Sequence, residues 1–263
     1  MKMPQFFQEM IKANKVKVDP SKDRTWLDER RKKMDAGWAE DYYTAKAEKE
    51  RQSWLNDSLW SGNQPLQFTF ENWVPAMQEN DEQARNIGNQ SWVMADRVIK
   101  GEQFNILMNG EPGTGKTSLA LAIAWKAWQE AEVNFLFIST MELVSMFSQR
   151  FDDQEVAWRL DALQKRAKNA PILILDDFGT EGGMKNENGY YKPVRKDMQE
   201  WLYQVANARY DQITNSHKGV TIVTTNNTSG ELIQMYNPKL ISRVITKRRP
   251  NVLNFDGLDD MRG

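Results

Sequence analysis

The stretch FNILMNGEPGTGKTSLA, residues 104–120, decides the fold. An apolar, β-prone run over residues 104–108 leads into a glycine-rich loop, and the chain then contains no Gly or Pro until well past residue 131. The pattern G-x-x-x-x-G-K-[ST] has its meaning only between a strand and a helix. Because both neighbours are present here, the stretch predicts a phosphate-binding loop rather than an ordinary turn.

The residue types in this loop match the chemistry of phosphate binding. Its glycines permit backbone angles that a Cβ would oppose, so successive N–H groups can turn inward around a phosphate, and the following helix adds the positive end of its dipole. Lys116 is expected to reach the β- and γ-phosphates, and the Thr117 hydroxyl is expected to bind Mg²⁺. The candidate nucleotide-binding residues are Gly110, Glu111, Pro112, Gly113, Thr114, Gly115, Lys116, Thr117 and Ser118.

A second key stretch is PILILDDFG, residues 171–179, an apolar run that ends in two carboxylates. Buried parallel strands have this composition, and ligand-binding groups follow their carboxyl ends. This is a Walker B pattern, in which Asp176 would hold Mg²⁺ and Asp177 would polarise the attacking water. Adjacent residues of a strand point to opposite sides, so the two carboxylates are expected to have separate roles.

Composition excludes several other kinds of chemistry. The 263 residues include no Cys, which removes disulfides and thiol nucleophiles, and a single His, which makes histidine-based catalysis an unattractive reading. The net charge of -1 provides no global attraction for nucleic acid. No apolar run approaches the roughly 20 residues that span a bilayer, so we expect a cytoplasmic protein without membrane contact.

The stretch SGNQP at residues 61–65 is typical of a break between helices. It divides the chain into a predicted small helical domain, residues 1–64, and a main domain, residues 65–263. A short apolar stripe falls within residues 6–11. A longer stripe comprises Leu27, Met34, Trp38, Tyr42 and Ala45 amid dense mixed charge. So small a unit buries little core, and its apolar stripes serve either as docking faces or as ordinary packing surfaces.

Further elements complete an α/β pattern. Residues 133–139 and 220–226 read as buried strands, and Ser139 to Glu142 fit a capping box for the helix that follows. The predicted fold is a parallel sheet of about five strands with helices on both faces and the nucleotide at the carboxyl edge of the strands.

In this order, a phosphate-binding loop, an Asp-Asp Walker B pattern, a strand ending Thr-Thr-Asn and the sequence Ser-Arg-Val at 242–244 resemble an AAA+ ATPase. More narrowly, FTFENW at 68–73, DDFGTE at 176–181 and NARYD at 207–211 are similar to replicative helicase loaders of the DnaC/DnaI type. IstB-type transposition helper ATPases are near relatives of these loaders. The resemblance covers residues 67–263 and implies an AAA+ P-loop NTPase core that uses ATP and Mg²⁺.

The resemblance assigns further roles. Lys116, Asp177, Asn226 and Arg243 would be catalytic, with Asn226 as the sensor-1 residue and Arg243 as an arginine finger acting on a neighbouring subunit's ATP. Asp177 replaces the Glu of many AAA+ proteins, which suggests slow hydrolysis. Few residues follow the strand-like stretch 251–255, so we expect a helical lid that is reduced or absent, and Arg262 is the candidate for sensor 2.

Contacts with DNA are also suggested by the resemblance. The helix over residues 141–151 occupies a strand-binding position in the resembled loaders. Phe147, Arg150 and Phe151 would offer stacking and charge to single-stranded DNA, although they are equally suitable core residues.

The function that the resemblance implies is an ATP-dependent loader, and a compact loader with an unrelated amino-terminal segment would suit a phage. It would bind a hexameric DnaB-type replicative helicase through residues 1–64, place it on single-stranded DNA, and assemble with further copies of itself through Arg243. Two alternatives stay open. One is an IstB-type transposition helper acting on duplex DNA with a transposase, and the other is a nucleotide-gated adaptor with little turnover.

Overall fold

The computed structural model describes residue 9 and residues 25–62, 64–183, 187, 189 and 191–262. The chain divides into two compact units, Met1–Glu50 and Arg51–Gly263. The longest helix, α2, runs over Thr25–Asp57 and contributes residues to both units. The apolar residues of the stripe predicted within residues 6–11 lie outside the described residues.

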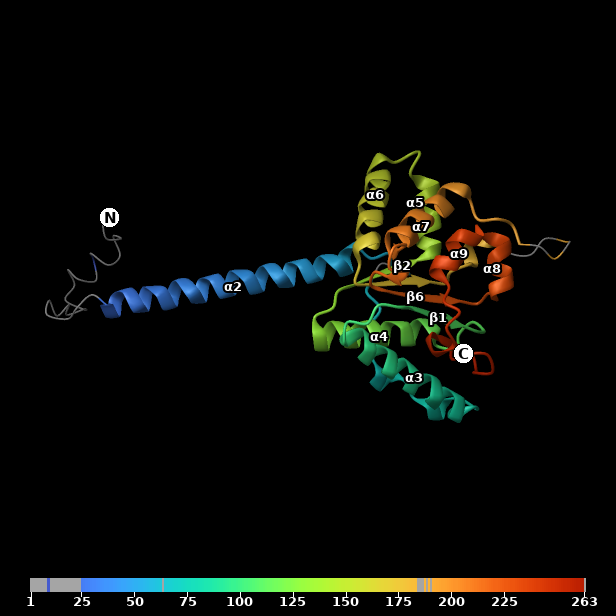
Figure 1. Cartoon of the computed structure of the whole chain (residues 1–263), viewed down its shortest axis with the longest axis horizontal. Coiled ribbons are helices and arrows are strands. Elements are labelled where there is room, and N and C mark those ends of the chain that lie inside the picture. Colours follow the sequence, from blue (N-terminus) through green and yellow to red (C-terminus); the bar gives the residue numbers. More distant parts are fainter. Residues whose placement is uncertain are drawn as a thin grey trace. The chain divides into compact units, whose positions relative to one another are not determined.

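A five-stranded parallel sheet forms the centre of the second unit, in the order β2-β3-β6-β1-β7 (Figure 1). Its strands are short and mostly buried, as expected of parallel strands that are covered on both faces. They are β1 Asn105–Asn109, β2 Phe135–Ser139, β3 Ile172–Asp176, β6 Val220–Thr225 and β7 Val252–Asn254. The predicted parallel sheet of about five strands is confirmed.

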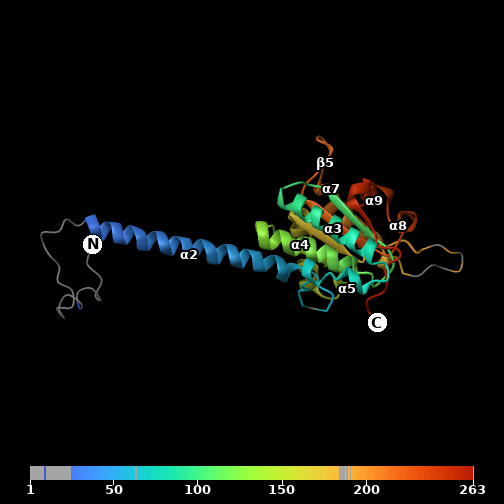
Figure 2. The same ribbon diagram turned by 90° about the horizontal axis from the view of Figure 1, so that it is seen from below.

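Helices cover both faces of this sheet. Figure 1 and Figure 2 show α3 and α4 on one face and α5, α6 and α7 on the other. The longer helices are α3 Asp81–Ile99, α4 Lys116–Ala131, α5 Thr140–Gln149, α6 Gln154–Asn169 and α7 Lys196–Ala208. Two short helices, α8 Ser229–Met235 and α9 Pro238–Val244, connect β6 to η4 Arg249–Asn251 and β7. The remaining elements are η1 Phe70–Asn72, η2 Pro75–Met77, η3 Thr180–Gly182 and the hairpin β4 Tyr210–Asp211 with β5 Ser216–His217.

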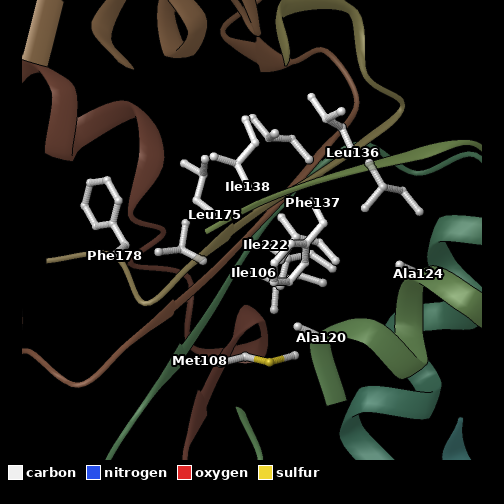
Figure 3. Packing of buried hydrophobic residues seen from close by; sticks show 14 of the residues in the cluster. Ile106, Met108, Ala120, Ala124, Leu136, Phe137, Ile138, Leu175, Phe178 and Ile222 are labelled. Atoms are coloured by element: carbon white, nitrogen blue, oxygen red, sulfur yellow. The ribbon is translucent and has the colours of Figure 1, made fainter. Parts of the chain in front are cut away.

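The hydrophobic core lies on both sides of the sheet because successive strand residues alternate between its faces. Figure 3 shows Ala120 and Ala124 of α4 close to Ile106 and Phe137, whereas Leu175 lies on the other side. The small alanines let α4 approach the sheet closely, which fixes the helix that follows the glycine-rich loop.

The end of α2 and the residues after it belong to this second unit. Trp54, Leu55, Leu59 and Trp60 are buried in its core, and Trp60 stacks on Phe137 with ring centroids 4.7 Å apart. The Leu59 N–H donates to the Phe137 carbonyl, which covers the free edge of β2. These residues therefore belong to the second unit, although they precede the predicted boundary at 64/65.

Among the described residues, no helix is both long and apolar enough to cross a membrane.

Candidate functional site

The glycine-rich loop lies at the carboxyl edge of the sheet, between β1 and α4. Gly113 and Gly115 have φ angles of 79° and 92°, which residues with a Cβ rarely adopt. A Cβ on Gly115 would also lie 2.6 Å from the Trp73 ring. Thr114 is buried and its hydroxyl donates to the Glu111 carbonyl at 2.8 Å, so the loop is held in a defined shape. Glu111 and Pro112 are exposed, and Ser118 is half-buried in α4.

Lys116 is buried within the loop, where its Nζ donates to the carbonyls of Gly110 and Glu111. Burial lowers the pKa of this amine, and the charge of Arg262 lowers it further, whereas the nearby carboxylates of Asp177 and Asp176 oppose the shift. The carbonyl bonds hold the ammonium group inside the loop, beside both Walker B acids. This placement suits the predicted contact with phosphates.

Asp176, the last residue of β3, accepts hydrogen bonds from side chains of α4 and β6. Its Oδ1 accepts hydrogen bonds from the Thr117 hydroxyl at 2.8 Å and from the Thr224 hydroxyl at 2.7 Å. Burial raises the pKa of its carboxyl to about 6, assisted by the charge of Asp177 and opposed by both hydroxyl groups and Lys116. An acidic oxygen with a raised pKa is a group that a cation would stabilise in its ionised form.

The donor set fits Mg²⁺. Thr117 and Asp176, the two predicted ligands, lie within hydrogen-bond distance of each other, and the phosphates of a nucleotide would complete the coordination, as is usual for Mg²⁺. The residues that the structure describes include no cluster of three His, Cys, Asp or Glu side chains able to hold a metal on their own. When bound, Mg²⁺ would neutralise phosphate charge at this point.

Asp177 has a φ of 53°, in the left-handed region. Its N–H donates to the Thr224 hydroxyl at 2.9 Å, and its carbonyl accepts from the Thr140 hydroxyl at 2.9 Å. Ser139, predicted to cap α5 with its side chain, makes no such bond. The first turn of α5 instead contributes Thr140 to the Asp177 backbone, so two neighbouring elements fix the turn.

Asn226 follows directly after β6 and is exposed at the same edge of the sheet. Its neighbour Thr225 pairs with Asn109, the last residue of β1, so the end of β6 lies beside the start of the loop. The structure thus places Lys116, Asp177 and Asn226 at one edge of the sheet.

Arg243 lies at the opposite edge. Its carbonyl accepts a hydrogen bond from the side chain of Asn105, the first residue of β1, at 2.7 Å. Its guanidinium lies 5.3 Å from the Tyr203 ring centroid and donates to the Lys239 carbonyl. The chain therefore does not bring Arg243 to its own loop, and a role for this residue in hydrolysis would require a second subunit.

The three residues predicted to contact DNA are in different environments. Phe147 is buried in the core, so its ring is not available for stacking on a base, and this part of the prediction does not fit the structure. Arg150 pairs with Asp197 at 2.8 Å. Phe151 is 74% exposed but is followed directly by Asp152 and Asp153, whose charges disfavour a phosphate backbone.

Two contacts of the loop were not predicted from the sequence, although the segments that make them were singled out there. Trp73, in the FENW stretch, packs its ring against Gly115, and its indole N–H donates to the Ala84 carbonyl at 3.0 Å. The segment after β7 also reaches the loop, since the Met261 N–H donates to the Gly113 carbonyl at 3.1 Å. This contact brings Arg262 close enough to affect the pKa of Lys116. The sequence FTFENW was the only signal for the contact of Trp73 with the loop. The proposal of Arg262 as sensor 2 was the only signal for the contact of the carboxyl-terminal segment.

A glycine-rich loop follows β1, paired acids stand at the end of β3, and the polar end of β6 lies between these two strands. This arrangement defines a P-loop nucleoside triphosphatase. Residues 106–256, more than half of the chain, match the ATPase family associated with various cellular activities (AAA), and the chain belongs to this family. A putative ATP-binding protein of insertion sequence IS21 from Pseudomonas aeruginosa is 25% identical over 156 residues. That match covers 58% of this chain and 51% of the Pseudomonas protein, so the chain matches about half the length of this relative.

Solved structures share the fold. AMPPCP-bound DnaA from Aquifex aeolicus has a TM-score of 0.52 at 15% identity, over 73% of this chain and 50% of that one. A DnaI structure has a TM-score of 0.50 at 17% identity, over 73% of this chain and 92% of that one. Together with the family match, the site indicates an AAA ATPase domain that binds a nucleotide.

Proposed function

We propose that this protein is an ATP-dependent helicase loader. It binds a hexameric DnaB-type replicative helicase through its amino-terminal segment and delivers the helicase onto single-stranded DNA. Mg²⁺ and ATP occupy the site formed by the glycine-rich loop, Asp176 and Asp177. The similarity in fold to DnaI supports this choice among the activities of AAA proteins.

The observation that carries the proposal is the exposed apolar stripe of α2. Met34, Trp38 and Tyr42 recur every four residues along one side of the helix, and each is more than half exposed. Single exposed apolar residues are ordinary, but a row that includes Trp and Tyr is typical of a helix that inserts into a groove of a partner.

The test is capture of a purified DnaB-type helicase by the full chain and by residues 51–263, each in ATP and in ADP. Deletion before Arg51 removes the first unit and leaves the buried residues around β2 in place. We expect capture by the full chain alone, and a loss of capture in Trp38→Ser. The control is Lys32→Ala, on another face of the same helix. Absence of capture in both nucleotides would contradict the proposal.

Hydrolysis is proposed to depend on assembly, because Arg243 lies at the edge of the sheet opposite the loop of its own chain. Arg243→Ala is expected to leave ATP binding intact and to lower hydrolysis at protein concentrations at which subunits associate. We propose that turnover is slow, as the short side chain of Asp177 suggests. Equal hydrolysis by the variant and the parent protein would contradict the role of Arg243.

A second candidate is supported by the sequence similarity to the IS21 ATP-binding protein. Under this alternative the chain acts with a transposase on duplex DNA. Binding of duplex DNA in preference to single strands, together with failure to capture the helicase, would favour it. A third reading, an adaptor that binds ATP without turning it over, predicts no hydrolysis even when helicase and DNA are present.

A further inference from the structure

A buried tyrosine–glutamate pair connects two parts of the chain that the proposed mechanism treats separately. Tyr236 follows α8 and its hydroxyl donates to Glu181 Oε1 in η3, 55 residues earlier in the chain. Burial, reinforced by the charge of Glu181, raises the pKa of the Tyr236 hydroxyl well above its usual value. Burial also raises the pKa of the Glu181 carboxyl, and the hydrogen bond from Tyr236 opposes this rise.

Glu181 belongs to the turn that carries Asp177. Its second oxygen, Oε2, accepts the Gly179 N–H at 2.9 Å, which closes the segment between Asp177 and η3. Phe178 stacks on the Tyr236 ring with centroids 4.5 Å apart and planes at 8°. The same tyrosine thus contacts this turn through both its ring and its hydroxyl.

Tyr236 and Asn237 join α8 to α9. Asn237 begins α9 as its N-cap, and Arg243 lies in the last turn of that helix. The side chain of Tyr236 therefore connects the turn that carries Asp177 with the N-terminal end of α9. The same helix carries Arg243 in its last turn.

We propose that Glu181 and Tyr236 are positioning residues, through which the state of a subunit's own ATP site sets the placement of the Arg243 that it presents to its neighbour. This inference rests on the proposed action of Arg243 across a subunit boundary. A shift of the Asp177 turn when the site binds a nucleotide, passed on from Asp176 through the Thr224 hydroxyl that bonds to both residues, would move Tyr236 through the ring stack and the hydrogen bond. Because the core around this pair is closely packed, such a displacement is transmitted to α9 and not absorbed locally.

The hydroxyl group can be removed without dismantling this region. The Val194 N–H donates to the Met235 carbonyl at 3.0 Å, and the Asn237 N–H donates to Gln199 Oε1 at 2.8 Å, so the segment around α7 also holds the α8–α9 junction. Tyr236→Phe keeps the ring stack and deletes only the hydrogen bond. Glu181→Gln is a second variant that keeps the size of the side chain and removes its charge.

The test uses full-length chains mixed in pairs. Arg243→Ala subunits keep their own Asp177 but lack the finger, whereas Asp177→Asn subunits cannot hydrolyse ATP but can supply Arg243. Mixing the two is expected to restore hydrolysis at the Arg243→Ala sites. We expect subunits that combine Asp177→Asn with Tyr236→Phe or with Glu181→Gln to restore at least about tenfold less activity than Asp177→Asn subunits do. This is the magnitude expected for loss of a buried hydrogen bond to a charged group.

A matched control is Tyr191→Phe, which removes another tyrosine hydroxyl that bonds to a glutamate, Glu231 of α8, outside the Asp177 turn. The double variant with Asp177→Asn and Tyr191→Phe should restore hydrolysis as fully as Asp177→Asn alone. Thermal unfolding of each variant separates loss of coupling from loss of fold. Full restoration by the folded Tyr236→Phe and Glu181→Gln chains would overturn the coupling. Failure of Asp177→Asn itself to restore activity would instead overturn the finger role of Arg243, and the coupling with it.

Discussion

Asp177 combines a catalytic position with an uncommon backbone angle. In the left-handed region at φ 53°, Asp and Asn are better tolerated than residues with longer side chains. The sequence alone suggested that Asp in place of Glu signals slow hydrolysis. The structure offers a second physical reason for the shorter acid, because the turn between β3 and η3 requires this angle.

Asp177→Glu is therefore expected to lower the free energy of unfolding by about 0.5–1 kcal/mol and to give no gain in hydrolysis. Denaturant unfolding and steady-state ATPase assays measure the two effects. Asp177→Gly provides the control, since it should preserve stability while abolishing hydrolysis. A stable and faster Asp177→Glu enzyme would show that the backbone does not select the residue.

Asp176 makes the stability of the nucleotide-free protein depend on pH. Its pKa rises from 3.8 to about 6 on folding, so the folded state binds the proton more tightly than the unfolded state. The contribution of this group to stability is therefore full below pH 3.8 and is lost as the pH rises through 6. Asp176→Asn removes the titration and should stabilise the protein at pH 8 by about 1–3 kcal/mol.

Urea unfolding of both proteins at pH 5 and pH 8, without Mg²⁺ or nucleotide, measures this difference. The gain from Asp176→Asn should be much smaller at pH 5, where the wild-type carboxyl is mostly protonated. An equal gain at the two pH values would contradict this account.

At the scale of single residues, motifs predicted the loop and both acids because their chemistry requires fixed residue types at fixed spacing. Thr224 could not be predicted in the same way, because a buried strand Thr has no distinctive sequence signal. Its hydroxyl bonds to both Walker B acids only through the pairing of β3 with β6. The prediction for Phe147 failed for another reason, because Phe serves equally well in a hydrophobic core and on a DNA-binding surface.

At the scale of elements, Trp73 connects α3 to the glycine-rich loop. Its ring lies between Gly88 of α3 and Gly115, and a Cβ added to Gly88 would be 2.8 Å from the indole. Gly88 is an unusual choice within a helix, where Ala is favoured by roughly 0.5–1 kcal/mol. The close approach of Trp73 explains it.

Gly88→Ala is expected to push the indole towards the loop and to weaken ATP binding by about tenfold, since overpacking costs about 1–3 kcal/mol. Titration calorimetry with ATP measures the change. Gly230→Ala in α8 is the matched control, because a Cβ there has only the Thr228 hydroxyl oxygen nearby, at 3.9 Å. Unchanged affinity in Gly88→Ala would show that Trp73 does not set the shape of the loop.

The strands and long helices of the core could be predicted from apolar runs and helical spacing. Helix α6, for example, begins after Asp153, whose carboxylate caps it at the Glu155 N–H. The contact between Leu59 and β2 could not be predicted, because bridges between distant segments leave no periodic pattern. For the same reason, the side chain of Ser139 fitted a capping pattern that the structure does not use.

At the scale of the whole molecule, the division at residues 50 and 51 makes a direct prediction about truncation. Residues 51–263 should unfold cooperatively at nearly the same temperature as the second unit in the full chain. Residues 65–263 lose four buried apolar side chains, at about 1.5–3 kcal/mol each, and expose the edge of β2. We expect a loss on the order of 5 kcal/mol or more, together with aggregation.

Thermal unfolding and size-exclusion chromatography of the two truncated proteins test this expectation. Equal stability would mean that residues 51–64 contribute little to the core. The sequence predicted two parts to the chain, but the breaker at 61–65 favoured the later boundary. The tryptophans before this stretch fit a separate helical unit equally well by sequence, and only the structure shows that they are buried in the second unit.

The contact between the Met261 N–H and the Gly113 carbonyl has a practical consequence for spectroscopy. The chain contains no cysteine, so a thiol introduced as Met261→Cys, at a position that is 42% exposed, would be the only one available for labelling. A fluorophore attached there would lie next to the phosphate-binding loop without replacing any residue of the loop. Its emission would report nucleotide arrival and departure in real time, in every subunit of an assembly.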